Sequence, residues 1–306
     1  MSLPLVSIIT PTYNRQTIKS AIGSALRPCG VPVEHIVVDD CSSSDHWHFL
    51  LDVAQNFQGQ VQVLRTPVNS GPGTARNMGL AQSRAKYVFF LDSDDIFAPD
   101  ALAHLVREAE MHQSDIVIPL AVRADNHIHG GFSSSDSCSA KPFAQCAAIR
   151  DLGPCKLFNR QFLLNHALTF PHDRYFGEDQ VFMLKAYLST PRISIIAHEI
   201  GLFLGASADS LTAAPKIGDI LHTMHEVMVF ANQLPPSDVN RLLILKRIFN
   251  ADMRFVLGLL QKSGQSGEFD LYIRDQILPL LDDVGRNFVD DEVKMVLARR
   301  LAALAR

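Results

Sequence analysis

Three carboxylates follow an apolar run in the stretch YVFFLDSDD, which ends in Asp92, Asp94 and Asp95. Clustered like charges raise one another's pKa values, so such a group calls for a cation or for solvent. Residues i and i+2 of an extended segment point the same way, so Asp92 and Asp94 should converge. Mg²⁺ and Mn²⁺ prefer such oxygen ligands. The stretch therefore predicts a divalent-cation site, and an Asp-rich turn in which Asp95 caps the next segment is the structural alternative.

A second pair of carboxylates, Asp39 and Asp40, comes directly after the apolar run HIVV and precedes three serines. A carboxylate in this position could accept a hydrogen bond from a ribose or from the imide N–H of a nucleobase. The alternative is that the region only caps a helix, through a residue of the stretch 42–45. We expect divided roles, in which one Asp binds a ligand and a serine or Asp45 caps.

The segment NSGPGTARNMGL, residues 69–80, is a glycine-rich turn that opens a predicted helix. Its backbone N–H groups and the helix N-terminus could meet an anion. Arg76 could pair with a phosphate or with the acidic cluster, and a surface arginine is the alternative. The segment is neither G-x-G-x-x-G nor a Walker loop, which disfavours dinucleotide binding.

Another acidic pair, Glu178 and Asp179, stands just before a helical pattern. A carboxylate in a binding site could act as a general base that deprotonates an acceptor hydroxyl. Acidic residues also stabilise a helix N-terminus by interacting with its dipole. From the residue pattern alone, the second interpretation is favoured.

Short apolar strands alternate with helical patterns over the first 120 residues, which predicts a mostly parallel sheet with helices on both faces. Ligands of open α/β sheets bind beyond the carboxyl ends of the strands. The polar groups at 10–14, 39–40 and 92–95 should therefore share one edge. The predicted strands cover residues 5–10, 35–39, 61–65, 87–91 and 115–119.

From about residue 216 onward, apolar residues recur at helical spacing. We expect an α/β domain over residues 1–215 and an all-helical C-terminal module over residues 216–306. The module would pack against the α/β half or form a homo-oligomer interface. Its basic, amphipathic end, VKMVLARRLAALAR, is favoured to be a packed helix, and contact with a membrane surface is the alternative.

Charge and cysteine content exclude several classes of function. The net charge of −4 provides no general basic field for nucleic acid. The five cysteines lack C-x-x-C spacing, which favours free thiols in a reducing compartment over a disulfide framework or a zinc site. The sequence shows no basic leader and no apolar stretch of the ~18–20 residues that a membrane span needs. We expect a cytoplasmic protein, with the inner face of the membrane as the alternative location.

Five stretches occur in the order and approximate spacing of the inverting GT-A glycosyltransferases of family 2, which the chain resembles over roughly residues 4–212. They are VSIITPTYNR, HIVVDDCSSSD, NSGPGTARNMGL, YVFFLDSDDIFAPD and FGEDQVF. The resemblance implies a GT-A fold and the metal-dependent transfer of a hexosyl or N-acetylhexosaminyl unit. A nucleotide-sugar, with UDP-sugar favoured, would be the donor, and a glycan or lipid-linked hydroxyl of a cell-surface polysaccharide would be the acceptor. A nucleotidyltransferase and a non-catalytic or degenerate nucleotide-sugar-binding scaffold are the alternatives.

The resemblance also implies roles for particular residues. Asp40 would recognise the uracil edge, Asp94 would coordinate Mn²⁺ or Mg²⁺, and Asp92 would contact the ribose or a metal-bound water. Asp179 matches the catalytic base. The implied nucleotide-binding residues are Pro11, Thr12, Tyr13, Asn14, Arg15, Asp39, Asp40, Arg76, Asn77, Asp92 and Ser93.

One departure from the family pattern lies in LFLGASADSLT, residues 202–212. Many members carry a basic residue here, which would grip the diphosphate or complete the metal shell. This chain has none, so Ser207, Asp209, Ser210 or a basic residue of the helical module would have to replace it. The departure predicts altered donor binding and supports the degenerate-scaffold alternative.

Overall fold

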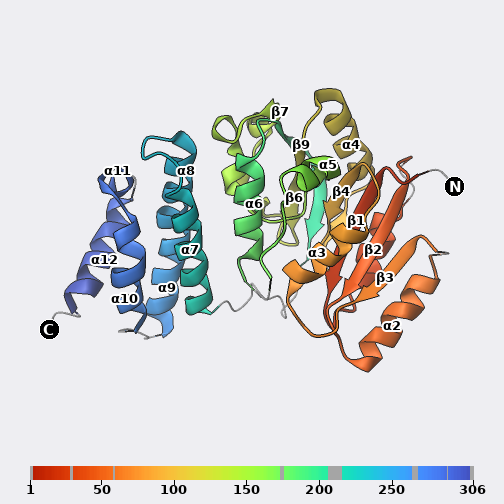
Figure 1. Cartoon of the computed structure of the whole chain (residues 1–306), viewed down its shortest axis with the longest axis horizontal. Helices are drawn as coiled ribbons and strands as arrows, with labels where there is room; N and C mark the ends of the chain where they lie inside the picture. Colours follow the sequence, from red (N-terminus) through yellow and green to blue (C-terminus); the bar gives the residue numbers. More distant parts are fainter. Residues whose placement is uncertain are drawn as a thin grey trace. The chain divides into compact units, whose positions relative to one another are not determined.

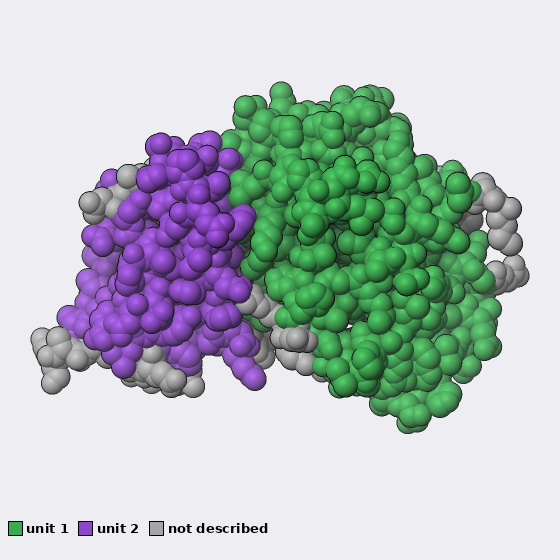
Figure 2. All heavy atoms as spheres, in the orientation of Figure 1, with its two compact units in different colours: residues 1–210 green, residues 211–306 purple. Residues whose placement is uncertain are grey.

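A computed structural model describes residues 3–27, 30–57, 59–172, 176–205, 216–263, 268–287 and 289–303. The chain forms two compact units, residues 1–210 and 211–306, which Figure 2 shows in different colours. The predicted boundary at residue 215 falls outside the described residues and stays a prediction.

The first unit is built on a mixed sheet that has nine strands within the described residues, in the order β3-β2-β1-β4-β8-β6-β9-β5 with β7 also paired to β9 (Figure 1). The strands are β1 (Val6–Thr12), β2 (Val33–Asp39), β3 (Val61–Arg65), β4 (Tyr87–Phe90), β5 (Ile96–Phe97), β6 (Ile116–Arg123), β7 (Cys138–Lys141), β8 (Leu157–Asn159) and β9 (Ile193–Leu204).

Strands β1 to β4 pair in parallel, as the alternation of strands and helices predicts. Beyond β4 the sheet becomes mixed, because β8 runs antiparallel to both β4 and β6 while β6 and β9 are parallel. Strands β5 and β7 pair antiparallel with β9. The α/β class is confirmed, and the added antiparallel strands are two to four residues long, too short to show a period in the sequence.

Helices cover both faces of this sheet. Residues Ile8 and Val37 belong to a core cluster that also includes residues of α1, α2 and α4. On the opposite face, Gly79 of α3 lies against Ile9, so closely that a side chain at 79 would collide with it. The helices are α1 (Ile18–Ala25), α2 (Ser44–Gln55), α3 (Pro72–Gln82), α4 (Ala101–His112), α5 (Arg160–Asn165) and α6 (Glu178–Leu188). Short 3₁₀ turns cover residues 129–131, 134–136, 143–145 and 147–150.

The second unit is helical throughout its described residues, as predicted. Its elements are α7 (Ile217–Ala231), α8 (Val239–Arg247), the π-helical turn η5 (Ile248–Asp252), α9 (Met253–Ser263), α10 (Glu268–Tyr272), the π-helical turn η6 (Ile273–Ile277), the 3₁₀ turn η7 (Leu278–Leu280), α11 (Asp283–Arg286) and α12 (Asp291–Ala303). Helix α12 buries Val293 and Leu297, which agrees with the packed-helix interpretation of this end. Among the described residues, no helix is long and apolar enough to cross a membrane.

Candidate functional site

The carboxyl ends of β1, β2 and β4 meet at one edge of the sheet. Thr12 pairs with Asp39 across β1 and β2, and Ile9 pairs with Phe90 across β1 and β4. The three polar segments that follow these strands therefore lie next to one another. This juxtaposition is the one that the parallel strand order predicts.

The loop after β1 is tied to the start of α2. The Asn14 backbone N–H donates to Ser42 Oγ at 2.8 Å, and Ser43 N–H donates to Asn14 Oδ1 at 2.9 Å. Ser43 is the N-cap of α2, as expected for a serine of the stretch 42–45. Tyr13 is 48% exposed, so its ring is accessible at the mouth of this edge.

Asp39 is fully buried at the end of β2. Its Oδ2 accepts a hydrogen bond from Ser42 N–H at 3.1 Å and lies 3.4 Å from Arg65 Nε. Its Oδ1 and the hydroxyl oxygen of Thr12 are buried without a hydrogen-bond partner among the described residues. Buried polar atoms rarely stay unpaired, so this edge can accept a polar ligand.

Asp40 binds the loop that opens α3. Its carboxylate accepts hydrogen bonds from Thr66 Oγ1 at 2.8 Å, from Ser70 N–H at 3.0 Å and from Gly71 N–H at 2.8 Å. These donors occupy both carboxylate oxygens and hold the loop against β2. The contacts give Asp40 a structural role, and its recognition of uracil stays a prediction.

Arg76, on α3, connects two acidic segments of the candidate site. Its NH2 group donates to Asp92 Oδ1 and its NH1 group to Glu178 Oε1, both at 2.8 Å. The guanidinium carbon also lies 5.2 Å from the centre of the Phe170 ring. Burial opposes the charge of the guanidinium, but Asp92 and Glu178 outweigh this effect and raise the pKa of Arg76. Of the three interpretations that the sequence allowed, the structure shows the pairing with the acidic cluster.

Asn77 holds the segment that leads into α6. Its side-chain NH₂ donates to Phe170 O, and Phe170 N–H donates to its Oδ1, both at 2.9 Å. A Cβ atom at Gly73 would lie 2.9 Å from the backbone oxygen of Pro171 and 3.0 Å from Glu178 Cγ, so a side chain there would have to displace the segment that leads into α6. Asn77 therefore positions α6 against α3, and its predicted contact with the nucleotide stays a prediction.

The acidic segment after β4 turns sharply, because Asp95 N–H donates to Asp92 O at 3.1 Å. Asp95 is buried, and its carboxylate accepts hydrogen bonds from Gly205 N–H at 3.0 Å and from the Cys155 thiol at 3.4 Å. Burial and the charge of Asp92 raise the pKa of Asp95 to about 8. Asp95 thus steadies the loop, which was the structural alternative for this residue.

Asp94 is half-buried, and burial together with the charge of Asp92 raises its pKa. A divalent cation would offset the repulsion that destabilises these charged carboxylates. Asp92, Asp95 and Cys155 each offer a ligand atom within 4.8 Å of the others. Asp95 and Cys155 already bond to each other, and the coordination of a cation by Asp92 and Asp94 stays a prediction.

Asp179 is half-buried at the start of α6, where its Oδ1 accepts a hydrogen bond from Gln180 N–H at 2.8 Å. Burial and the neighbouring charge of Glu178 raise its pKa to about 7, against the opposing effect of Arg76. A carboxylate that titrates near neutral pH is suited to general-base catalysis. Glu178, in contrast, is held by Arg76.

The residues missed in the sequence are those that act through tertiary contacts. Cys155 and Gly205 approach the acidic segment from distant parts of the chain, and neither carried a signal in the sequence. Glu178 was recognised as part of an acidic pair, but its bond to Arg76 was not. The expected substitutes Ser207, Asp209 and Ser210 lie outside the described residues.

The chain is similar to several known proteins. The sequence profile of the family described as Glycosyl transferase family 2 matches residues 7–177, more than half of the 306 residues. The poly(ribitol-phosphate) beta-glucosyltransferase of Bacillus spizizenii is 30% identical over 198 residues, 63% of this chain and 31% of that protein. The succinoglycan biosynthesis protein ExoO of Rhizobium meliloti is 32% identical over 206 residues, 63% of this chain and 58% of that protein.

TarS of Staphylococcus aureus, a poly(ribitol-phosphate) beta-N-acetylglucosaminyltransferase, is 27% identical over 197 residues, 62% of this chain and 34% of that protein. The chain thus spans about a third of the length of the two poly(ribitol-phosphate) glycosyltransferases. The crystal structure of TarS 1–349 superposes with a TM-score of 0.78 at 21% identity, covering 98% of this chain and 88% of that one. Its complex with UDP-GlcNAc gives a TM-score of 0.74 at 23% identity, covering 95% of this chain and 83% of that one. These similarities confirm the GT-A fold.

Proposed function

Because the chain belongs to glycosyl transferase family 2, we propose that it transfers a sugar from a UDP-sugar to a hydroxyl group during synthesis of a cell-surface polysaccharide. The named activities of its relatives and the UDP-GlcNAc complex of TarS support this assignment. The observation that carries it is the link from Asp92 through Arg76 to Glu178. This link brings the acidic segment after β4 and the acidic pair that opens α6 into one site.

The donor nucleotide would lie along the loop after β1, beside the exposed ring of Tyr13. The unpaired buried oxygens of Asp39 and Thr12 support this placement, because a nucleoside could donate hydrogen bonds to them. Contacts of the remaining loop residues and of Ser93 with the donor stay predictions.

Asp92 and Asp94 would hold Mn²⁺ or Mg²⁺. When bound, the cation supplies Lewis-acid stabilisation of the negative charge that develops on the leaving diphosphate. Arg76 fixes the Asp92 carboxylate, while the Asp95 contacts with Gly205 and Cys155 fix the turn around Asp94. These contacts support the proposal that Asp92 and Asp94 are the two ligands.

Asp179 would accept the proton of the acceptor hydroxyl. The hydroxyl oxygen forms a bond to the anomeric carbon while the bond from that carbon to the diphosphate oxygen breaks. The attack comes from the face opposite the leaving group, so a single displacement inverts the configuration. Arg76 keeps Glu178 paired, which leaves Asp179 as the acidic residue at the start of α6 that can take the proton.

The test compares sugar transfer by the full chain and by Asp179→Asn, with UDP-GlcNAc and UDP-glucose as donors and Mn²⁺ present. Loss of a general base should reduce the transfer rate by about 10²–10⁴-fold. Asp52→Asn, a change on α2, is the matched control and should retain the rate. Unchanged transfer in Asp179→Asn would refute the assignment of the base, and no transfer with any nucleotide-sugar would refute the activity.

A nucleotide-sugar-binding scaffold is the second candidate, favoured by the absence of a basic residue over residues 202–212. Such a protein should be stabilised by UDP with Mn²⁺ in a thermal-shift assay yet show no transfer. Homo-oligomer formation through the C-terminal helices and contact with a membrane surface stay predictions.

A further inference from the structure

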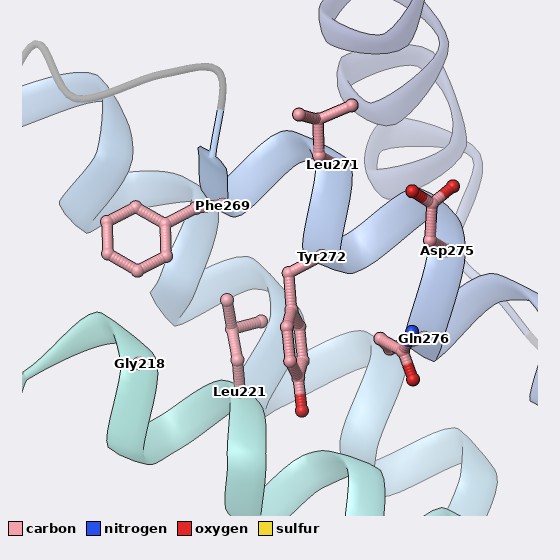
Figure 3. Close-up of a pocket in the computed structure, with 7 residues that line it drawn as sticks. All are labelled: Gly218, Leu221, Phe269, Leu271, Tyr272, Asp275 and Gln276. Atoms are coloured by element: carbon pink, nitrogen blue, oxygen red, sulfur yellow. The ribbon is translucent and has the colours of Figure 1, made fainter.

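A pocket lies within the helical unit, between the start of α7 and the segment formed by α10 and η6. Gly218 and Leu221 of α7 form one side, and Phe269, Tyr272 and Gln276 of the second segment form the other. Figure 3 shows the rings of Phe269 and Tyr272 directed toward α7, whereas Asp275 points away from α7 at the rim. The cavity measures about 320 Å³, at the lower end of the range for small-molecule sites.

Three of the lining residues share one helical stripe, and Leu271 and Asp275 flank it. Phe269, Tyr272 and Gln276 stand at positions i, i+3 and i+7, whereas the core-facing Ile273 and Ile277 are completely or almost completely buried. The rings of Phe269 and Tyr272 are only partly buried. The stripe therefore stands beside the core of the unit and leaves aromatic surface accessible to a ligand.

The absence of a side chain at Gly218 helps to keep the pocket open. A Cβ atom at this position would lie 3.8 Å from the Phe269 ring, an ordinary contact, so a larger side chain would enter the space beside the ring. Residue 218 is in the first turn of α7, and its backbone is not in the left-handed region. Substitutions there should change the pocket without straining the helix.

The side chains that line the pocket indicate which class of ligand it could bind. Among the described residues, no cationic side chain lines the pocket, and Arg274 is paired with Asp275 at 2.6 Å, so these residues offer a phosphate no free positive charge. One carboxylate is too few for a divalent cation. Aromatic faces attract the C–H groups of a sugar ring, while a phenol, an amide and a carboxylate can bind its hydroxyls.

We propose that this pocket is a subsite for a neutral saccharide unit of the acceptor polymer. The inference rests on the proposed glycosyltransferase function, because that function implies a glycan acceptor longer than the single reacting unit. The subsite would raise the affinity for polymeric acceptors and leave the chemical step unchanged.

The experiment measures binding of maltotetraose and chitotetraose to the full chain by saturation-transfer NMR and calorimetry, in the presence of UDP and Mn²⁺. At least one of them should bind without competing with UDP. Tyr272→Ala and Gly218→Phe should each weaken this binding by about tenfold or more. Gly218→Ala is the matched control, because it adds only an ordinary contact and should retain binding.

Thermal melting of each variant confirms that it is folded. Absence of binding by both oligosaccharides, or equal binding by Gly218→Phe and Gly218→Ala, would overturn the proposal. Sedimentation that shows a dimer dissociating only in Gly218→Phe would also overturn it, because a second copy of the chain would then occupy the pocket.

The two proposals fail in different ways. If no donor supports transfer but the oligosaccharide binds at this pocket, the transferase function fails and the saccharide site stands. If transfer to a short acceptor proceeds and no variant of the pocket changes the Michaelis constant for a polymeric acceptor, the subsite fails alone. In Asp179→Asn, saccharide binding should persist although transfer is lost.

Discussion

A single guanidinium, that of Arg76, connects two acidic clusters that lie far apart in the sequence. It bonds Asp92 after β4 and Glu178 at the start of α6, with only 5% of its side chain exposed. Removing one partner of a buried ion pair leaves the other charge uncompensated, which is costly. Arg76 therefore contributes both to stability and to the geometry of the candidate site.

We expect Arg76→Met to lower the free energy of unfolding by about 3 kcal/mol, the lower end for a broken buried pair because Asp92 is partly exposed. Chemical denaturation monitored by circular dichroism measures the change. Arg84→Met is the control, because the Arg84 side chain is largely exposed in its ion pair with Glu34. Loss of this pair should lower the free energy of unfolding by only about 0–1 kcal/mol. Equal costs for the two variants would contradict the role given to Arg76.

The pH dependence of transfer should report on Asp179. Its pKa is raised to about 7, and only the deprotonated form can accept the acceptor proton. The transfer rate should therefore rise with pH up to about 7 and then level off, and Asp179→Asn should lose this rise. Steady-state rates across a pH series measure the profile, and a rate that already levels off near pH 4 would contradict the raised pKa.

The raised pKa of Asp179 also affects stability, which should decrease with rising pH while the transfer rate increases. The native state holds the Asp179 proton more tightly than the unfolded chain between the ordinary value of 3.8 and about 7. The contribution of this carboxyl to stability is thus largest at low pH and decreases as the pH rises through that window. A group that is made reactive in this way opposes folding at neutral pH.

At the scale of elements, the end of β9 supports the acidic segment through Gly205. Its N–H bonds Asp95, and a Cβ atom at this position would lie 2.6 Å from Asp94 Cβ. Such an overlap cannot be relieved without shifting the backbone that carries Asp94. The position directly after β9 therefore tolerates only glycine beside the acidic segment.

Gly205→Ala should weaken binding of UDP in the presence of Mn²⁺ by about tenfold or more, because it displaces a predicted metal ligand. Calorimetric titration with and without Mn²⁺ measures the effect. Gly258→Ala on α9 is the matched control, because nothing lies within 4 Å of its added carbon. Unchanged nucleotide affinity in Gly205→Ala would exclude this role for the end of β9.

The elements also show what the sequence could predict. Strands β1, β2 and β4 were predictable because each is a short apolar run followed by polar residues. Strand β8 has three residues and follows Cys155 and the fully buried Lys156, so its segment shows no alternating pattern. The buried lysine is compensated by Asp151 at 2.9 Å, a tertiary contact that no local pattern reveals.

In the candidate site too, tertiary contacts could not be predicted from the sequence. The spacing of Asp92 and Asp94 predicted a cation site, whereas only the family resemblance pointed to Asp179 as a base, and both roles stay predictions. The hydrogen bonds of Asp40 and Asn77, which turn both side chains toward the protein itself, depend on partners 26 to 93 residues away. Sequence could therefore predict which residues gather at the edge, but not which of them face the protein.

At the scale of the whole molecule, each unit buries its own core. Phe90, Phe158 and Phe182 pack edge to face in the first unit. Met228 of α7 and Val256 of α9 are fully buried in the second. Units with separate cores can unfold as separate cooperative transitions. The proposed donor site lies in the first unit, so a nucleotide should stabilise that unit.

We therefore expect two calorimetric transitions that respond to different perturbations. Met228→Ala removes a fully buried side chain and should destabilise the second unit by about 2–5 kcal/mol. UDP with Mn²⁺ should raise the melting temperature of the first unit, because ligand binding stabilises only the unit that holds the site. This increase should be the same in the wild-type protein and in Met228→Ala. Met295→Ala, an exposed position on α12, is the control and should change neither transition. A single transition shifted by both the substitution and the nucleotide would instead mean that the two units unfold as one.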